Sequence, residues 1–205
     1  MDAMKMALAD LLDAFASTEA VPGGGSAAAL AGALGVSLLL MVAGMTKTKS
    51  GTPEETADLA DAAARLRPLR DTLAELVERD SDAYRRVMAA FKLPKTSDQE
   101  KAARARAIDA ATRAATDAPL DTMRACQQAL AGAVTIAENG SRNASSDAGV
   151  AIELLLAALL GARLNVDVNL KGLSDASYVK SVTTECDALQ RDANANVERA
   201  RAALR

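Results

Sequence analysis

Residues 21–46 read VPGGGSAAALAGALGVSLLLMVAGMT, and this stretch decides the fold. From Ala27 to Met45 no residue carries a charge, and only Ser37 is polar. Such a run is long enough to raise the question of a membrane span. It is rich in alanine and glycine, however, and it has neither an aromatic belt nor a charge-flanked partner span. We therefore predict a helix that is buried inside the protein rather than in a membrane.

The turn before this helix is the first candidate for a binding site. Pro22 is followed by Gly23, Gly24 and Gly25, which can adopt positive φ angles that other residues avoid. Ser26 is predicted to cap the helix, whose N-terminus presents free N–H groups and the positive end of the helix dipole. Such a turn suits an anion, a carbonyl group or a flat ring. A tight connection between two helices explains it equally well.

The remainder of the chain also predicts helices. Only 2% of the residues are aromatic and there is no tryptophan, which disfavours a β-sandwich or a barrel. Pro68 predicts a kink or break, and Pro119 is expected to begin a new helix. The expected helices are 2–18, 27–45, 53–93, 98–117, 119–138, 147–164 and 175 to nearly the end, with irregular segments at 140–146 and 164–174. About seven helices with short connections predict an all-α, up-and-down bundle that forms one domain over residues 1–205.

Two of the expected helices are strongly apolar. The helix at 27–45 has no charge, and the helix at 147–164 is interrupted by Glu153 and Arg163. This is more apolar surface than a monomeric bundle normally buries, because a surface helix needs only one apolar stripe. A subunit interface that covers one of these helices would account for it, so we expect a homodimer.

The composition limits the chemistry that the protein can perform. The chain has no histidine, which excludes histidine-based triads and dyads and the usual zinc sites. Cys126 and Cys186 fall within helical patterns and are expected to be reduced thiols in the interior. A net charge of −3 without a basic stripe gives no support for nucleic-acid binding. The first residues do not resemble a secretory signal, so we expect a cytoplasmic protein.

Asp80 is the strongest candidate for a functional side chain. It lies seven residues after Leu73 and four before Tyr84, so it continues the apolar stripe of its helix. Burying an unpaired charge is costly, and desolvation would raise the pKa of this carboxyl toward the range useful for proton transfer. The alternative is an ion pair with an arginine at the edge of the stripe. Glu153 allows the same two interpretations with less local support.

Lysines and polar loops supply further candidates. Two predicted helices are followed by lysines, at Lys47, Lys49, Lys92 and Lys95. Each lysine stabilises a helix C-terminus through the dipole whether or not it binds anything, and together they would suit an acidic ligand tail. The segments 140–147 and 165–170 are rich in amides and short acids, many of which helix capping explains. The polar groups that exceed this need are Asn143, Asn165, Asn169 and Asp175.

Three segments together resemble the cyclodeaminase/cyclohydrolase family, whose members include the C-terminal half of formiminotransferase-cyclodeaminase and stand-alone methenyltetrahydrofolate cyclohydrolases. The segments are 21–46, ERDSDAYRRVMAAFKLPK at 78–95, and NGSRNASSDAGVAIELLLAALLGARLNVDVNL at 139–170. They occur in the order of the family, and the resemblance covers nearly the whole chain. It implies an all-helical homodimer that binds folate in a groove beside the glycine turn. It also implies that the apolar helix is buried in protein.

The resemblance carries over to individual residues. The acid of the family falls on Asp80, and the other matching polar positions are Gly23 to Ser26, Asn143, Asp147 and Asn169. One stretch departs from the pattern. Many relatives continue after the apolar helix with a Lys-Lys-Tyr-like sequence, whereas residues 46–52 here read TKTKSGT.

The expected reaction is the hydrolysis of 5,10-methenyltetrahydrofolate to 10-formyltetrahydrofolate. Asp80 would stabilise the cationic substrate and accept the proton of the attacking water, and no metal or redox cofactor is required. The turn from Pro22 to Ser26 would hold the pterin. The further residues expected to bind the substrate are Lys47, Tyr84, Lys92, Lys95, Asn143, Asp147 and Asn169. Of these, Tyr84 is also a candidate for proton transfer.

Two alternatives remain open from the sequence. One is cyclodeamination of 5-formiminotetrahydrofolate, which passes through the same tetrahedral carbon and expels ammonia. The other is a non-catalytic helical dimer that binds folate or acts as a scaffold. The position of Asp80 separates an enzyme from the second alternative, because a catalytic carboxylate must open onto a cleft next to Gly24. An Asp80 that is sealed in an ion pair with arginine would contradict the catalytic assignment.

Overall fold

Helices make up nearly all of the computed structural model, which describes residues 3–205, and these residues contain no strand. The two 3₁₀ helices are η1 (Ala3–Lys5) and η2 (Arg142–Ala144). The six α-helices are α1 (Leu8–Ala16), α2 (Gly24–Ala43), α3 (Pro53–Phe91), α4 (Asp98–Asn139), α5 (Ser145–Leu170) and α6 (Ala176–Ala203). The all-α prediction is confirmed, with six α-helices in this part of the chain in place of about seven.

Side-chain caps begin the long helices where the sequence predicts them. Thr52 Oγ1 accepts a hydrogen bond from the Glu55 N–H at the start of α3. At α4, Ser97 and Glu100 form a reciprocal capping box, with distances of 3.2 and 2.9 Å. The Asp175 carboxylate accepts from two N–H groups in the first turn of α6, so capping accounts for this acid and corrects the expectation that it exceeds that need. Each cap satisfies N–H groups that have no partner within the helix.

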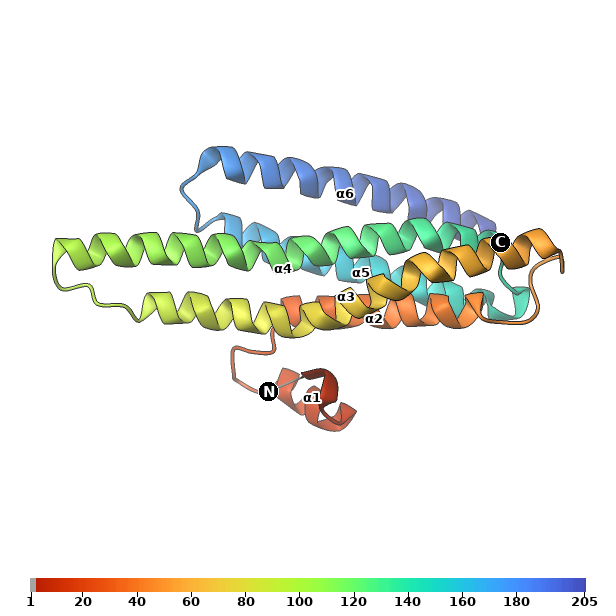
Figure 1. Cartoon of the computed structure of the whole chain (residues 1–205), viewed down its shortest axis with the longest axis horizontal. Coiled ribbons are helices and arrows are strands. Elements are labelled where there is room, and N and C mark those ends of the chain that lie inside the picture. Colours follow the sequence, from red (N-terminus) through yellow and green to blue (C-terminus); the bar gives the residue numbers. More distant parts are fainter. Residues whose placement is uncertain (1–2) are drawn as a thin grey trace.

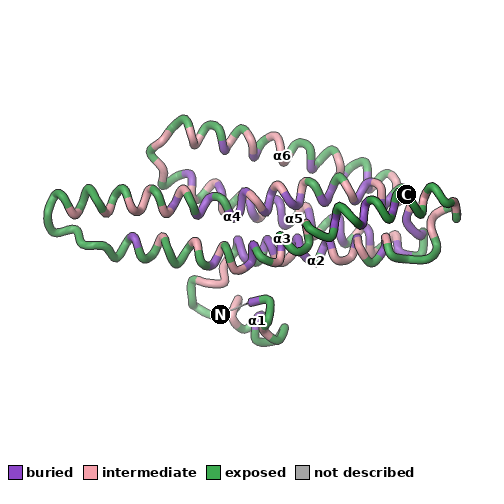
Figure 2. The backbone as a smooth tube through the Cα atoms, in the orientation of Figure 1, coloured by how far each residue is buried: buried purple, intermediate pink, exposed green. Residues whose placement is uncertain are grey.

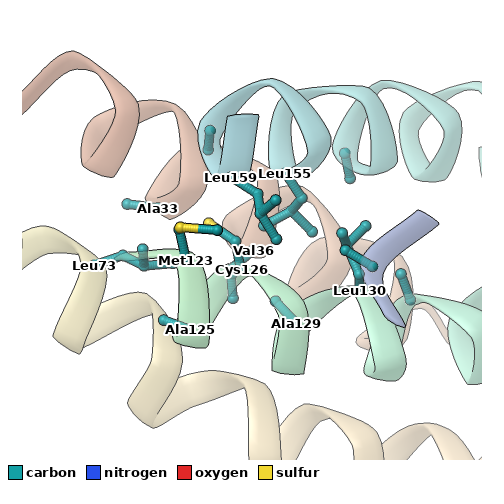
Figure 3. Close-up of a cluster of buried hydrophobic side chains, with 14 of the residues drawn as sticks. Ala33, Val36, Leu73, Met123, Ala125, Cys126, Ala129, Leu130, Leu155 and Leu159 are labelled. Atoms are coloured by element: carbon teal, nitrogen blue, oxygen red, sulfur yellow. The ribbon is translucent and has the colours of Figure 1, made fainter. Parts of the chain in front are cut away.

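Helices α2 to α5 form an up-and-down bundle in chain order, and α6 packs against α4 and α5 (Figure 1). The buried residues follow the centre of this bundle (Figure 2). At its middle, Val36, Leu73, Met123, Cys126 and Leu155 are fully buried and come from four different helices (Figure 3). The α3–α4 hairpin projects beyond the first residue of α2 (Figure 1), so α2 begins part-way along its neighbours.

The prediction that Pro119 begins a new helix is wrong, because α4 runs without interruption through it. A proline inside a helix removes the N–H that would bond the carbonyl four residues earlier. Here that carbonyl is Ala115 O, and it accepts instead from Nδ2 of Asn169 at 3.0 Å. A side chain of α5 thus replaces the missing main-chain donor. Pro68 likewise lies within the continuous helix α3 and does not break it.

Three other predicted boundaries are corrected. The segment expected to be irregular from residue 164 is helical up to Leu170. Helix α2 begins at Gly24 with Gly23 as its N-cap, so Ser26 is an internal helical residue rather than the cap. The first helix spans 8–16 rather than 2–18, and residue 2 lies outside the described residues.

The two apolar helices are only partly covered within one chain. By length and composition, Gly24–Ala43 and Arg142–Leu170 would be long enough to cross a membrane, yet 50% and 39% of their most apolar windows are buried inside the protein. The core helix of a soluble protein passes the same test. Large apolar side chains still face outward from α2 and α5, at Leu34, Met41, Val150, Leu160, Leu164 and Val168. We call this set the outer α2–α5 face.

Candidate active site

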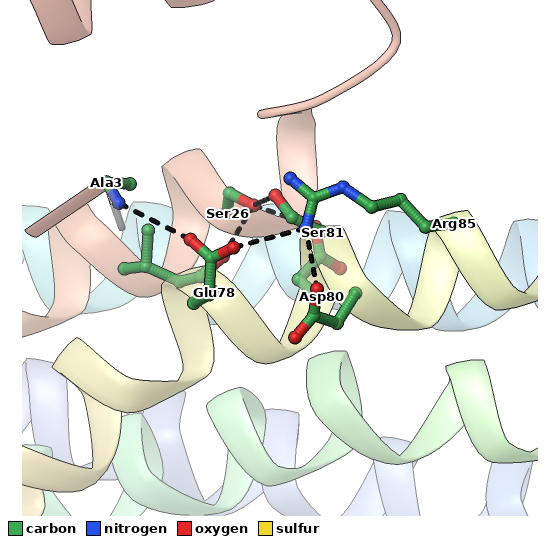
Figure 4. Close-up of polar contacts among 8 residues, drawn as sticks. Ala3, Ser26, Glu78, Asp80, Ser81 and Arg85 are labelled. Atoms are coloured by element: carbon green, nitrogen blue, oxygen red, sulfur yellow. Dashed lines mark hydrogen bonds and ion pairs between the residues drawn. The ribbon is translucent and has the colours of Figure 1, made fainter. Parts of the chain in front are cut away.

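The carboxylate of Asp80 meets the first turn of α2. Ser26, fully buried in that turn, places its Oγ 3.1 Å from Asp80 Oδ2 and 2.8 Å from the main-chain oxygen of Val77. Ser81 Oγ lies 3.1 Å from the same hydroxyl (Figure 4). A serine hydroxyl has one proton to donate, which Ser26 can direct to the Val77 oxygen or to the Asp80 carboxylate, and its oxygen can accept from the Ser81 hydroxyl. This cluster holds the start of α2 against the middle of α3.

Gly25 explains why the turn contains glycine at its centre. A Cβ built on Gly25 would lie 2.6 Å from Cγ of Asp80 and closer still to Oδ1, so no other residue fits beside this carboxylate. Backbone conformation is not the reason. Among the described residues only Gly51 is a glycine with positive φ, which corrects the expectation that the triplet needs such angles. The requirement at Gly25 is therefore space for the acid.

A cavity of about 310 Å³ opens in front of this carboxylate. It lies where α2 begins and where α3, α4 and α5 continue past it. The side chains and backbone that line it are those of Ala20, Val21, Gly23, Gly24, Gly25, Asp80, Ala83, Tyr84, Val87, Ala115, Asn165, Val168 and Asn169. The N–H groups of Gly24 and Gly25 precede the first intrahelical hydrogen bond of α2, which Ala27 donates to Gly23. The cavity thus joins an acid to a helix N-terminus.

Among residues 3–205, Asp80 has no cationic side chain as a partner. Its neighbour Arg79 pairs with Asp121 at 3.1 Å, and Arg85 pairs with Glu78 (Figure 4) and also with Asp82. No ion pair within residues 3–205 includes Asp80. Burial raises the pKa of this carboxyl above its ordinary value, and the hydrogen bonds from Ser26 offset only part of the rise. A half-buried carboxylate with a raised pKa, open to a cavity, is suited to proton transfer.

Comparison with known proteins identifies the family. A family model described as "Formiminotransferase-cyclodeaminase" matches residues 7–188. This chain belongs to that family. It is 43% identical over 188 residues to a protein named methenyltetrahydrofolate cyclohydrolase from Methylorubrum extorquens, a match that covers 92% of this chain and 90% of the relative. The resemblance seen in the sequence is confirmed.

Two further relatives share the helical domain. The formimidoyltransferase-cyclodeaminase of Gallus gallus is 31% identical over 159 residues, which are 78% of this chain but 29% of that protein. This chain therefore spans less than a third of the length of that animal relative. The crystal structure of formiminotetrahydrofolate cyclodeaminase from Thermotoga maritima superposes with a TM-score of 0.87 and 26% identity, covering 98% of this chain and 96% of that one. The bundle is thus the fold of this family.

The family's candidate residues are only partly gathered at the cavity. Gly23, Gly24, Gly25, Asp80, Tyr84 and Asn169 line it, and Ser26 lies behind the carboxylate. Pro22 does not line the cavity, although Val21 and Gly23 on either side of it do; the Val21–Pro22 peptide bond is cis. Asn165 lines the cavity although the sequence left it only as a surplus amide. A helical interpretation of 165–170 would have found it, since Asn165 and Asn169 are one turn apart.

The remaining candidates lie elsewhere in this chain. Asn143 and Asp147 belong to η2 and the first turn of α5, so about 27 Å of helix separates Asp147 from Asn165 at 1.5 Å per residue. Lys47 is exposed in the loop after α2, at that same opposite end. Lys92 and Lys95 are exposed just beyond the last residue of α3, outside the cavity wall.

Other acids and cavities fit a structural role better. Glu153 is exposed and forms an ion pair with Arg201 at 2.7 Å. A larger cavity of about 410 Å³ at the opposite end of the bundle is lined by Lys49, Arg142 and Arg205, but by no aspartate or glutamate. Within residues 3–205 no group of three or more cysteine and acidic side chains is placed to hold a metal ion. Cys126 and Cys186 are buried and free, as predicted.

Substitution of Gly25 by alanine should displace the Asp80 carboxylate, because the new methyl group would overlap it. We expect activity to fall about 100-fold or more, which is the usual effect of a misplacement near 1 Å in an active site. Gly149→Ala on α5 is the matched control, since this glycine does not line the cavity and its Cβ would be 3.9 Å from the nearest side-chain atom. Equal activity of the two variants would contradict the role assigned to Gly25.

Replacement of Asp80 by asparagine should raise the melting temperature at neutral pH. Folding raises the pKa of this acid, so the folded state binds its proton more tightly and the ionised form destabilises the fold. The gain should shrink as the pH falls toward the ordinary aspartate value of 3.8, where the wild-type carboxyl becomes neutral as well. Thermal unfolding between pH 3.5 and pH 8 tests this. Asp82→Asn, at an exposed position, should give no such gain.

Proposed function

We propose that this chain hydrolyses 5,10-methenyltetrahydrofolate to 10-formyltetrahydrofolate. The observation that carries the proposal is the Asp80 carboxylate, which opens onto a cavity at the N-terminus of α2 and has no cationic partner within the described part of the chain. A carboxylate in such a place is ready to meet a cationic ligand and to take up a proton. The name of the Methylorubrum extorquens relative supports this choice of substrate.

In the proposed reaction, water attacks the amidinium carbon between N5 and N10 of the folate. Asp80 stabilises the substrate cation and accepts one proton of the water as the C–O bond forms. The protonated acid then returns this proton to N5 as the C–N5 bond breaks. Loss of the remaining hydroxyl proton leaves the formyl group on N10, so the reaction releases one proton overall. The substrate is itself an electrophile, so the proposed mechanism requires neither a metal nor a redox cofactor.

The first turn of α2 is the proposed support for the folate ring. The N–H groups of Gly24 and Gly25 are free to donate, and neither glycine has a side chain to keep a flat ring away from the backbone. Lys92 and Lys95 lie just past the end of α3 and are exposed. We place them near the glutamate tail of the substrate, where two cations would attract its carboxylates.

Cyclodeamination of 5-formiminotetrahydrofolate is the second candidate. The name of the Thermotoga maritima structure and those of the longer relatives support it. The raised pKa of Asp80 is compatible with it as well, because a partly protonated acid can donate to a departing nitrogen. The greater identity to the cyclohydrolase, over nearly the full length of both chains, leads us to prefer hydrolysis.

Loss of the near-ultraviolet absorbance of methenyltetrahydrofolate tests the reaction directly. We expect the purified chain to accelerate ring opening over buffer, with a rate that rises with pH through an Asp80 pKa above the ordinary aspartate value. Asp80→Asn should lower the rate at least about 100-fold, as is usual on loss of a general base. Asp82→Asn should retain activity. Turnover of formiminotetrahydrofolate alone would select the second candidate, and turnover of neither would leave a non-catalytic folate-binding or scaffold protein.

We also propose that the chain forms a homodimer through the outer α2–α5 face. Leu34 on α2 and Val150 and Leu164 on α5 are more than half exposed, and a large apolar patch of this kind usually marks an interface. A second copy presents the same apolar helices and can therefore cover this face with its own. A cytoplasmic location is part of the same proposal and agrees with two free, buried cysteines.

Light scattering after gel filtration in detergent-free buffer tests the dimer. The wild type should elute with twice the mass of one 21.1 kDa chain. Leu34→Lys should shift the protein toward the monomer, because a charge would be buried at the interface. Ala60→Lys, on an exposed position of α3, is the control and should remain dimeric. A monomeric wild type, or one that needs detergent to stay in solution, would contradict this interface.

A further inference from the structure

Helix α5 presents two side-chain amides to the cavity, one turn apart. Asn165 and Asn169 are both half-buried, and both line the cavity that contains Asp80. Each Nδ2 group already donates one of its two protons to a main-chain oxygen. Asn165 donates to the main-chain oxygen of Gly161 at 2.9 Å, and Asn169 donates to that of Ala115 at 3.0 Å.

These hydrogen bonds determine which way each amide faces. A main-chain carbonyl can only accept, so the NH₂ end of each side chain must point to it and the oxygen must point away. The arrangement at Asn169 is imposed by Pro119. Because this proline has no N–H, Ala115 O lacks its usual helical donor and retains the side-chain amide of Asn169.

As a result, the α5 wall of the cavity offers acceptors. The Oδ1 atoms of Asn165 and Asn169 have no hydrogen-bond partner in the described part of the chain. The Asn165 amide lies beside the first turn of α2, since its Nδ2 and Oδ1 atoms would be 3.7 and 3.9 Å from a Cβ on Gly24. A ligand that rests on Gly24 therefore lies next to this amide, whose Oδ1 can accept a hydrogen bond, and next to the N–H donors of α2.

We propose that Asn165 and Asn169 select the ligand by accepting hydrogen bonds from N–H groups on the edge of its ring. The chemical class is a heterocycle with a row of donors, such as a 2-aminopyrimidinone with an exocyclic amino group and adjacent ring N–H groups. Rings that carry acceptors at these positions would leave two half-buried oxygens without partners, which is costly. This inference rests on the proposed function, since it assigns the groups that recognise the pterin part of the folate.

Comparison of two ligands on each variant tests the inference without confusing recognition with structure. The ligands are folic acid and its 2-desamino analogue, with dissociation constants from fluorescence or calorimetry. The proteins are the wild-type chain, Asn165→Ala, Asn169→Ala and the exposed control Asn194→Ala on α6. Any general damage to the cavity affects both ligands alike, so the ratio of the two constants isolates the hydrogen bond.

For the wild type and Asn194→Ala, we expect loss of the amino group to weaken binding about 10-fold, the effect of one buried hydrogen bond. We call this fold-change in the dissociation constant the penalty. In at least one of Asn165→Ala and Asn169→Ala, the penalty should fall below about 3-fold. The same penalty in all four proteins would overturn the inference. Turnover of methenyltetrahydrofolate, measured on the same wild-type preparation, keeps the two hypotheses apart. If the chain turns over methenyltetrahydrofolate but the penalties are equal, only the recognition by asparagine is refuted. If it shows no turnover and no folate binding, the proposed function itself is refuted.

Discussion

The close approach of Gly25 to the Asp80 carboxylate is the contact on which the site depends. It is possible only because residue 25 has no side chain, and the buried Ser26 hydroxyl holds the two helices together at that point. The contact sets where α2 starts relative to α3. Since α3, α4 and α5 continue past this start, a cavity remains that α2 would otherwise fill. The acid is thus desolvated by the same packing that exposes it to a ligand.

A proline supports the other wall of the cavity. Pro119 leaves Ala115 O without its helical donor, and Asn169 of α5 supplies one. This bond joins α4 to α5 beside the cavity and orients the amide so that its oxygen is free. The helix remains straight enough to continue for five more turns, since the lost hydrogen bond is replaced rather than left unsatisfied.

The two apolar helices are buried on one side and exposed on the other within a single chain. Helices α2 and α5 are apolar on their outer side as well as toward the core, and the ion pairs of α5 lie within that helix or reach to α6. A free energy of burial is gained only where apolar surface leaves water. Within one chain the outer α2–α5 face stays in contact with water and contributes little of this free energy. We therefore propose that a second copy of the chain covers it.

Much of the protein could be predicted from local sequence. The caps at Thr52 and Ser97 are short-range hydrogen bonds, and the period of the apolar residues gives the buried faces, including the unusual place of Asp80. The prediction that Pro119 starts a new helix was wrong because a local sequence rule cannot include a hydrogen-bond donor from another helix. Here Asn169 of α5 donates to the Ala115 oxygen.

Only the tertiary structure decided which candidates meet. The sequence grouped Asn143, Asp147 and Lys47 with Asp80 as candidates for one site, yet the first three residues lie at the opposite end of the bundle within one chain. The tertiary structure also showed that glycine is needed at position 25 to make room for the Asp80 carboxylate, and not to allow a positive φ. The sequence by itself determined the helices and the acid, because periodicity and capping act over a few residues. The cavity, its free amide oxygens and the unpaired state of Asp80 depend on contacts between helices more than 50 residues apart in the chain.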